Sequence, residues 1–111
     1  MKPATANEKA LSEARARILK ALAHPTRVFI VDKLQKQPYC VCELTDMVGL
    51  DTSTVSKHLS LLKAAGIVQD RKQGTSVYYS LSCDCIGQLM DGLESILRMN
   101  LAKQRAVLST A

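Results

Sequence analysis

Two pairs of cysteines, each pair separated by one residue, offer the clearest potential for chemistry in this sequence. Cys40 and Cys42 flank a valine, and Cys83 and Cys85 flank an aspartate. Each pair stands where a helix is predicted to begin, and a helix N-terminus favours the thiolate, which binds soft metal ions and reacts with oxidants. The residues leave three interpretations open: a soft-metal or metalloid site, a redox sensor that forms a reversible disulfide or polysulfide, and an inert set of thiols.

The spacing of a pair limits how it can bind one ion. In a regular helix, residues two apart point about 200° apart, whereas in extended backbone they project from one side about 6.6 Å apart. Cys40 and Cys42 are therefore expected to chelate together only if the start of their helix loosens. An ion bound there would distort that helix and shift the population away from its ordinary form.

A second set of functional residues lies on a predicted helix-turn-helix over residues 41–66. Gly49 permits a sharp turn between two short helical patterns. Leu44 and Val48 face inward on the first helix, and the second carries an apolar stripe of Val55, Leu59 and Leu62. The opposite face carries short polar side chains, as a helix in a DNA major groove requires. The predicted DNA-binding residues here are Thr52, Ser53, Thr54, Ser56, Lys57 and His58.

A predicted β-hairpin with a basic tip follows over residues 67–81. Its return strand alternates apolar with polar side chains, which is typical of a half-buried strand. A cationic hairpin after a candidate recognition helix supplies phosphate contacts, while the helix supplies base contacts. Each pattern alone also fits a solvated hairpin, but their order favours a winged helix-turn-helix. The tip residues predicted to contact DNA are Arg71, Lys72, Gln73 and Thr75.

The remaining patterns predict helices that support these elements. Residues 7–22 form an amphipathic helix, and a second, buried helix starts at Pro25 and is stopped by Pro38. A long helix over about 83–104 has an apolar face broader than so small a domain needs. The predicted fold is mainly α with a small β-hairpin wing, and it is a homodimer through its first and last helices.

Length and charge agree with this organisation. The 111 residues form one domain with a disordered N-terminal arm at about 1–6, and a net charge of +5 favours an anionic partner such as nucleic acid. The chain has no signal-peptide core and no run of about 18 apolar residues, which predicts a cytoplasmic protein without membrane contact. In a reducing compartment, four cysteines argue against a structural disulfide framework.

An enzyme is the alternative from another class. A cysteine near His58, with Asp46 or Asp51, has the residue types of a nucleophile and its base. The sequence, however, contains no Gly-rich phosphate loop, nucleophile elbow or His-Glu-x-x-His run. We therefore predict a protein that is not an enzyme.

Five sequence blocks in a fixed order resemble the ArsR/SmtB family of metal-responsive winged-helix repressors. The resemblance covers roughly residues 10–100. It implies a homodimeric transcriptional repressor that binds double-stranded operator DNA and leaves it when an inducer binds. The blocks occupy residues 21–27, 40–44, 54–59, 62–68 and 74–79.

The resemblance also suggests the inducer. The block at 40–44 is similar to the signature of arsenite, antimonite, cadmium and lead sensors, which implies that Cys40 and Cys42 are inducer ligands. Arsenite or antimonite is the preferred ion, cadmium, lead and zinc are further candidates, and no organic cofactor is expected. A departure is Thr45, which stands where arsenic sensors of this type often have a third cysteine. Residues 1–39 also lack the cysteines that cadmium-type members contribute from the N-terminal arm.

The second cysteine pair is the predicted source of the missing ligands. Cys83 and Cys85 either join the first pair in one site, within a subunit or across the dimer, or form a separate site. A zinc site on the last helix is discounted because no histidine lies beyond His58. His24 and His58 are interpreted as structural or DNA-facing residues.

Overall fold

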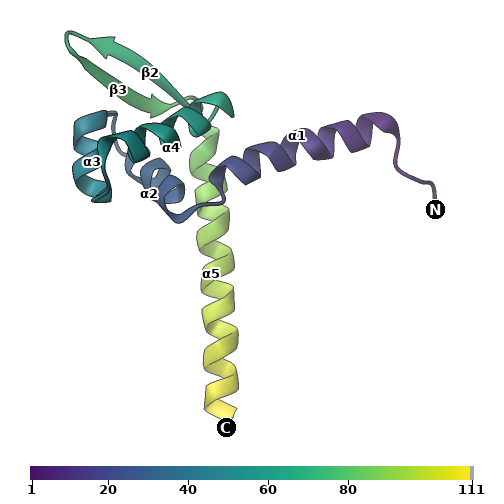
Figure 1. The fold of residues 1–111 in the computed structure, drawn as a ribbon. Coiled ribbons are helices and arrows are strands. Elements are labelled where there is room, and N and C mark those ends of the chain that lie inside the picture. The colour runs from purple at the N-terminus through teal and green to yellow at the C-terminus, as the bar shows by residue number, and fades with distance from the viewer. Residues whose placement is uncertain (111) are drawn as a thin grey trace.

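The computed structural model describes residues 1–110, and within that range the chain forms five helices and three strands. Helices α2, α3 and α4 make a head with a β-hairpin at its edge, and α1 and α5 lead away from it (Figure 1). The predicted mainly helical fold with a wing is confirmed. The elements are α1 (Ala6–Leu22), α2 (Pro25–Leu34), β1 (Tyr39–Cys40), α3 (Val41–Val48), α4 (Thr52–Ala64), β2 (Val68–Gln73), β3 (Ser76–Leu81) and α5 (Cys85–Thr110).

Local capping explains where the first two helices begin. The Thr5 hydroxyl accepts the Glu8 N–H at 3.1 Å, and the Glu8 carboxylate accepts the Thr5 N–H at 2.9 Å. This reciprocal capping box starts α1 at Ala6, so Thr5 is part of the cap rather than of a free arm. His24 caps α2, because its Nδ1 accepts the Thr26 N–H at 3.1 Å.

A buried aliphatic cluster holds the head together. Leu44 of α3 meets Val55, Leu59 and Leu62 of α4, and none of these four side chains has exposed surface (0% each). Gly49 ends α3 in the left-handed conformation (φ 77°), which lets α4 fold back against it. The predicted inward stripe and turn are therefore confirmed. Other members of the cluster are Leu22, Ile30, Val31, Leu34, Ile67, Val68 and Ile86.

The wing belongs to a three-stranded antiparallel sheet in the order β1-β3-β2. The sequence patterns predicted the β2–β3 hairpin but not β1, which has only two residues. In register, Cys40 of β1 lies opposite Tyr78 of β3, and Tyr78 lies opposite Arg71 of β2. The sheet thus connects the first cysteine pair directly to the wing.

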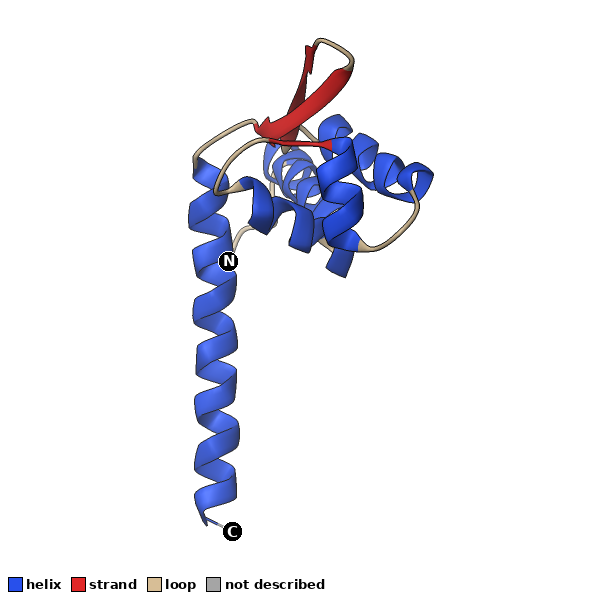
Figure 2. Ribbon diagram, turned by 90° about the vertical axis from the view of Figure 1, so that its left-hand side faces the viewer, coloured by secondary structure: helices blue, strands red, loops and turns tan. Residues whose placement is uncertain are grey.

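Helix α5 leaves the head and runs alone for most of its length (Figures 1 and 2). It ends at Thr110 rather than near 104, because the residues after Gly92 are mostly strong helix formers with no proline or glycine among them. It begins at Cys85 rather than at 83, where a disulfide holds the chain in a turn. Its apolar side chains Ile96 and Leu97 are 56% and 63% exposed.

Candidate nucleic-acid interface and cysteine pairs

The outer face of α4 presents short polar side chains and one lysine. Ser53 and Lys57 are exposed, and Ser56 between them is half-buried. At the start of the helix, the Ser53 hydroxyl donates to the Asp51 carboxylate at 2.6 Å, and this hydrogen bond is the main cause of a lowered pKa of Asp51. Of the other predicted residues of this face, Thr52 is exposed and Thr54 is half-buried.

His58 differs from these residues because its ring lies against another element. Its centroid is 4.5 Å from that of His24, and its Nδ1 is buried and has no hydrogen-bond partner. Burial lowers the pKa of His58, and the nearby charges of His24 and Arg27 lower it further. The geometry therefore gives His58 a packing role between α4 and the start of α2.

This environment makes stability depend on pH. In the unfolded chain, His58 takes up a proton near its ordinary pKa of 6.5, whereas in the folded chain its pKa is lower. The unfolded state then binds more protons below pH 6.5, so the stabilising contribution present above that pH is lost as the pH falls. Chemical denaturation at several values between about pH 5 and 8 should show this loss. His58→Gln should weaken the dependence, and an unchanged dependence would contradict this role.

The basic residues of the wing are exposed to solvent. Arg71 and Lys72 of β2 are exposed, as are Gln73 and Thr75 at the tip. An ion pair between Lys63 Nζ and an Asp70 carboxylate oxygen, at 3.0 Å, joins the end of α4 to β2. Because both partners are partly exposed, this pair contributes little stability.

Cys40 and Cys42 lie together at the start of α3. Cys40 is the N-cap residue with extended backbone (φ −79°, ψ 163°), and its Sγ is 3.0 Å from Cys42 Sγ. Two thiolates bound to one tetrahedral ion at about 2.3 Å would lie roughly 3.8 Å apart, so a small side-chain movement suffices. The expectation that the helix must loosen before the two sulfurs can meet is wrong. Cys40 precedes the helix, as the predicted start at residue 41 implies, and its extended backbone brings its sulfur to that of Cys42.

Glu43 forms a capping box with Cys40 at the start of α3. Its N–H donates to Cys40 Sγ at 3.4 Å, and its carboxylate accepts the Cys40 N–H at 3.1 Å. The side-chain hydrogen bond with Cys42, and after it one with the Glu43 side chain, raises the pKa of Cys40 to about 11, although the Glu43 N–H acts in the opposite direction. This is opposite to the sequence expectation of a thiolate at the helix start, so Cys40 is a protonated thiol near neutral pH.

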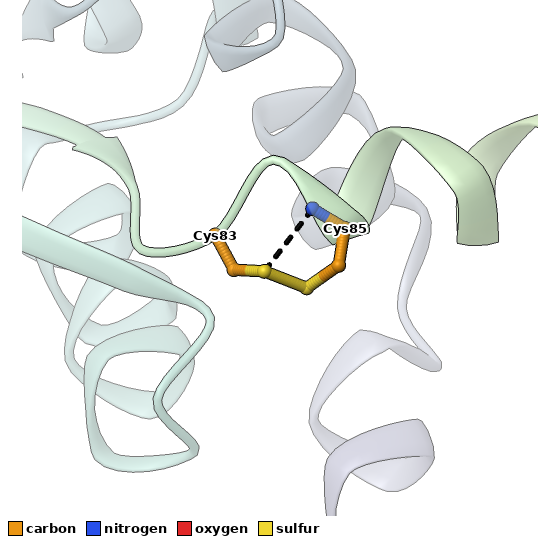
Figure 3. Close-up of a disulfide and its surroundings, with 2 residues drawn as sticks. All are labelled: Cys83 and Cys85. Atoms are coloured by element: carbon orange, nitrogen blue, oxygen red, sulfur yellow. Dashed lines mark hydrogen bonds between the residues drawn. A yellow bond between two sulfur atoms is a disulfide. The ribbon is translucent and has the colours of Figure 1, made fainter.

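Cys83 and Cys85 are bonded to each other in a disulfide, with their Cα atoms 5.1 Å apart (Figure 3). The Cys85 N–H donates to Cys83 Sγ at 3.1 Å. The residues argued against a structural disulfide framework and left a reversible redox disulfide open; the bond found here joins Cys83 to Cys85, and in this state neither sulfur is a metal ligand. Within residues 1–110, no cluster of three or more Cys, His, Asp or Glu side chains could hold a metal ion.

The two cysteine pairs also lie apart along the sheet. Cys40 pairs with Tyr78 inside β3, whereas Cys83 lies two residues past the end of that strand. The structure thus does not bring the four predicted ligands together within one chain. The strand that places Cys40 beside β3 has little signature in the sequence apart from Tyr39, an aromatic residue of a type that favours strands.

Comparison with protein families identifies related sequences. A family model described as a bacterial regulatory protein of the arsR family matches residues 24–70. The nodulation protein NolR of Rhizobium meliloti is 35% identical over 96 residues, which are 86% of this chain and 79% of that protein. The homolog in Staphylococcus aureus of the cadmium resistance transcriptional regulatory protein CadC is 42% identical over 77 residues, 68% of this chain and 64% of that protein.

Solved structures resemble the whole arrangement. NolR from Sinorhizobium fredii has a TM-score of 0.80 and 35% identity, with 86% of this chain and 96% of that chain covered. Mb0332 from Mycobacterium bovis, described as a homodimeric winged helix-turn-helix DNA-binding domain, has a TM-score of 0.80 and 29% identity, with 91% and 94% covered. Among residues 1–110 of the present chain, none of the helices has the length and apolarity needed to span a membrane.

Proposed function

The chain belongs to the arsR family of bacterial regulatory proteins, and on that premise we propose that it is an operator-binding repressor released when a soft metal or metalloid ion binds Cys40 and Cys42. As a member of this family it is a DNA-binding transcriptional regulator and not an enzyme. Arsenite and antimonite are the preferred inducers, with cadmium, lead and zinc as further candidates. The Staphylococcus aureus relative is named for cadmium resistance, which supports cadmium as an inducer.

The observation that carries the proposal is the 3.0 Å separation of the two sulfurs at the start of α3. Soft ions prefer thiolate ligands, and two thiolates already side by side need little rearrangement to bind one. A third donor would come from solvent, from a small thiol or from a partner subunit. Cys83 and Cys85 can contribute ligands to this site only after the disulfide between them is reduced.

The start of α3, where the ion would bind, also supports both DNA-contacting elements. Cys40 Sγ accepts the Glu43 N–H and so caps α3, which packs against α4. The Cys40 backbone pairs with β3, whose Tyr78 lies opposite Arg71 in the wing. An ion bound to Cys40 Sγ would compete with the Glu43 N–H for the sulfur that caps α3, so induction would act first on the start of α3 and through it on the recognition helix and the wing.

A homodimer is proposed through α1 and α5. Leu19 of α1 is 56% exposed and Leu97 of α5 is 63% exposed, on helices that project from the head (Figure 1). Burying such surfaces against a second copy gives a twofold axis and two DNA-reading heads. The homodimeric Mb0332 domain has the same fold.

The proposal is tested by operator binding of the reduced protein in the presence of a panel of ions and oxidants. Release by arsenite, antimonite or cadmium, with new sulfur-to-metal absorption bands in the ultraviolet, would support it. Release by peroxide or polysulfide alone would contradict it. That result would favour the second candidate, a repressor of the same fold that senses oxidants or reactive sulfur, for which the Cys83–Cys85 disulfide is the supporting observation.

The wing is expected to contact phosphates through Arg71 and Lys72. Replacing either residue by Ala should weaken binding to all duplexes alike and reduce the magnitude of the log–log salt slope by about one unit per lost contact. Arg105→Ala is the matched control, because it removes the same charge from the distal part of α5. If the loss is confined to one DNA sequence, the wing reads bases instead.

A further inference from the structure

A short connection joins the wing to α5, and it is anchored at both ends. On one side, the Ser82 N–H donates to the Ile67 carbonyl at 2.9 Å, which ties the end of β3 to the base of the wing. On the other side, Ile86 is only 8% exposed and packs into the core cluster of the head. The disulfide between Cys83 and Cys85 lies within the three residues between these anchors.

The disulfide determines where α5 can begin. Residues two apart in a regular helix point about 200° apart, so Cys83 and Cys85 cannot be bonded while both are helical. In the structure, the Ile86 N–H bonds the Cys83 carbonyl at 3.2 Å, and the Gly87 N–H bonds the Asp84 carbonyl at 3.2 Å. Both are tight turns that span three residues, unlike the four-residue pattern of an α-helix.

The sequence before Cys85 suits a longer helix once the bond is absent. Ser82 is a favoured N-cap residue, and Asp84 would place a negative charge in the first turn, where it interacts favourably with the helix dipole. A helix that starts at Cys83 would also exchange both tight turns for regular hydrogen bonds. The disulfide is the one covalent feature of the connection that opposes this extension.

We propose that Cys83 and Cys85 form a thiol–disulfide exchange site that sets the start of α5 and, through it, the position of the wing relative to the dimer helix. The site is accessible, because both cysteines are exposed. Its effect on operator binding rests on the proposed function, whereas its effect on α5 does not. It is separate from the Cys40–Cys42 pair and gives the protein a second input.

The chemistry is exchange with a low-molecular-weight disulfide. One cysteine thiolate attacks a sulfur of the oxidant RSSR and releases one RSH after protonation, which leaves a mixed disulfide. The second cysteine then attacks the protein sulfur of that bond and releases the second RSH. The two cysteines are oxidised by two electrons in total, and RSSR is reduced to two thiols.

The consequence for the fold is a change in the first turn of α5. The Cα atoms of Cys83 and Cys85 are 5.1 Å apart, so the connection is already compact, and a helix that starts at Cys83 replaces the two tight turns by α-helical hydrogen bonds. Because Ser82 is tied to the wing and Ile86 to the core, the turn between them sets the direction in which the wing leaves α5. The reduced chain can adopt either turn, whereas the oxidised chain keeps the tight turns. Operator binding requires two heads at a fixed half-site spacing, so we expect oxidation to weaken it.

The test uses the full chain carrying Cys40→Ser and Cys42→Ser, so that only Cys83 and Cys85 can react. The protein is equilibrated with reduced or oxidised glutathione, and hydrogen exchange of the Ile86 and Gly87 amides is measured. We expect an intramolecular disulfide with oxidised glutathione, and exchange of these amides roughly fivefold slower in the reduced protein. Operator affinity, compared between the two forms of the same variant, should fall on oxidation.

The control adds Cys83→Ser and Cys85→Ser and should show the slower exchange under both conditions. Failure to form the disulfide, equal amide exchange in both redox states, or equal operator affinity would each overturn the proposal. If neither form binds operator DNA, the proposed function fails, and amide exchange still decides whether the site controls α5.

Discussion

Cys40→Ser and Cys42→Ser should each bind operator DNA as the parent protein does and fail to release it when a soft ion is added. Serine keeps the size and polarity of the site, but its hydroxyl stays protonated near neutral pH and is a poor ligand for soft ions. Because loss of a supporting hydrogen bond at a metal site costs roughly 10–100-fold in affinity, loss of a ligand should cost at least about 100-fold.

The structure makes Cys40→Ser a clean variant. Cys40 caps α3 through its sulfur, and serine is among the preferred N-cap residues, so the capping box with Glu43 is retained. Operator titrations with and without arsenite, antimonite or cadmium measure the effect. If both variants still release DNA normally on addition of an ion, these cysteines are not the inducer ligands.

Cys83→Ser and Cys85→Ser are the comparison variants. A retained ion response would confine the inducer site to Cys40 and Cys42, and a lost response would place all four cysteines in one sensor. If Cys40→Ser and Cys42→Ser abolish release by peroxide or polysulfide but not by any ion, the redox function replaces the metal function.

Ion affinity at this site should rise with pH. The pKa of Cys40 is raised to about 11, so this thiol must lose its proton when it binds an ion near neutral pH. Cys40 alone then contributes about a tenfold gain in affinity for each pH unit between about 6 and 8. Spectroscopic titrations at several pH values measure this slope, and Cys40→Ser should reduce it by about one unit. A flat profile in the parent would contradict the protonated state of Cys40.

Periodicity predicted the parts of the fold that depend on burial. The stripe of Val55, Leu59 and Leu62 and the turn at Gly49 follow from where apolar side chains and a positive φ are required, and each is found as predicted. The same reasoning located the wing, because alternation and a basic tip are local signals. Periodicity does not predict local geometry that depends on the contacts of a single side chain.

The cysteine pairs illustrate that limit. Cys40 lies outside α3 because a two-residue strand pairs with β3, and so short a strand has no periodicity to read. His58 follows the polar face of α4 by position, yet its ring packs on His24, a residue 34 positions earlier in the chain. Both outcomes depend on contacts between distant segments, which a single sequence does not specify.

The recognition face should be the other site of large effects. Ser56→Ala should weaken binding to the operator through loss of base-edge hydrogen bonds worth about 1–3 kcal/mol, which is roughly 5–150-fold in affinity. Lys57 is exposed on the same face, and Lys57→Ala should weaken binding through a lost base or phosphate contact. Binding curves on operator and on unrelated duplex separate these effects, because a lost base contact reduces only the specific affinity.

Matched controls distinguish this face from the remainder of the surface. Lys103→Ala removes the same charge as Lys57→Ala, but from the distal part of α5, and should leave operator affinity nearly unchanged. Ser60→Ala removes a hydroxyl one turn further along α4, where the helix is expected to rise out of the groove, and should have a smaller effect than Ser56→Ala. Unchanged affinity in both Ser56→Ala and Lys57→Ala would show that α4 does not read DNA with this face. The wing and the head would then have to approach the duplex from another side.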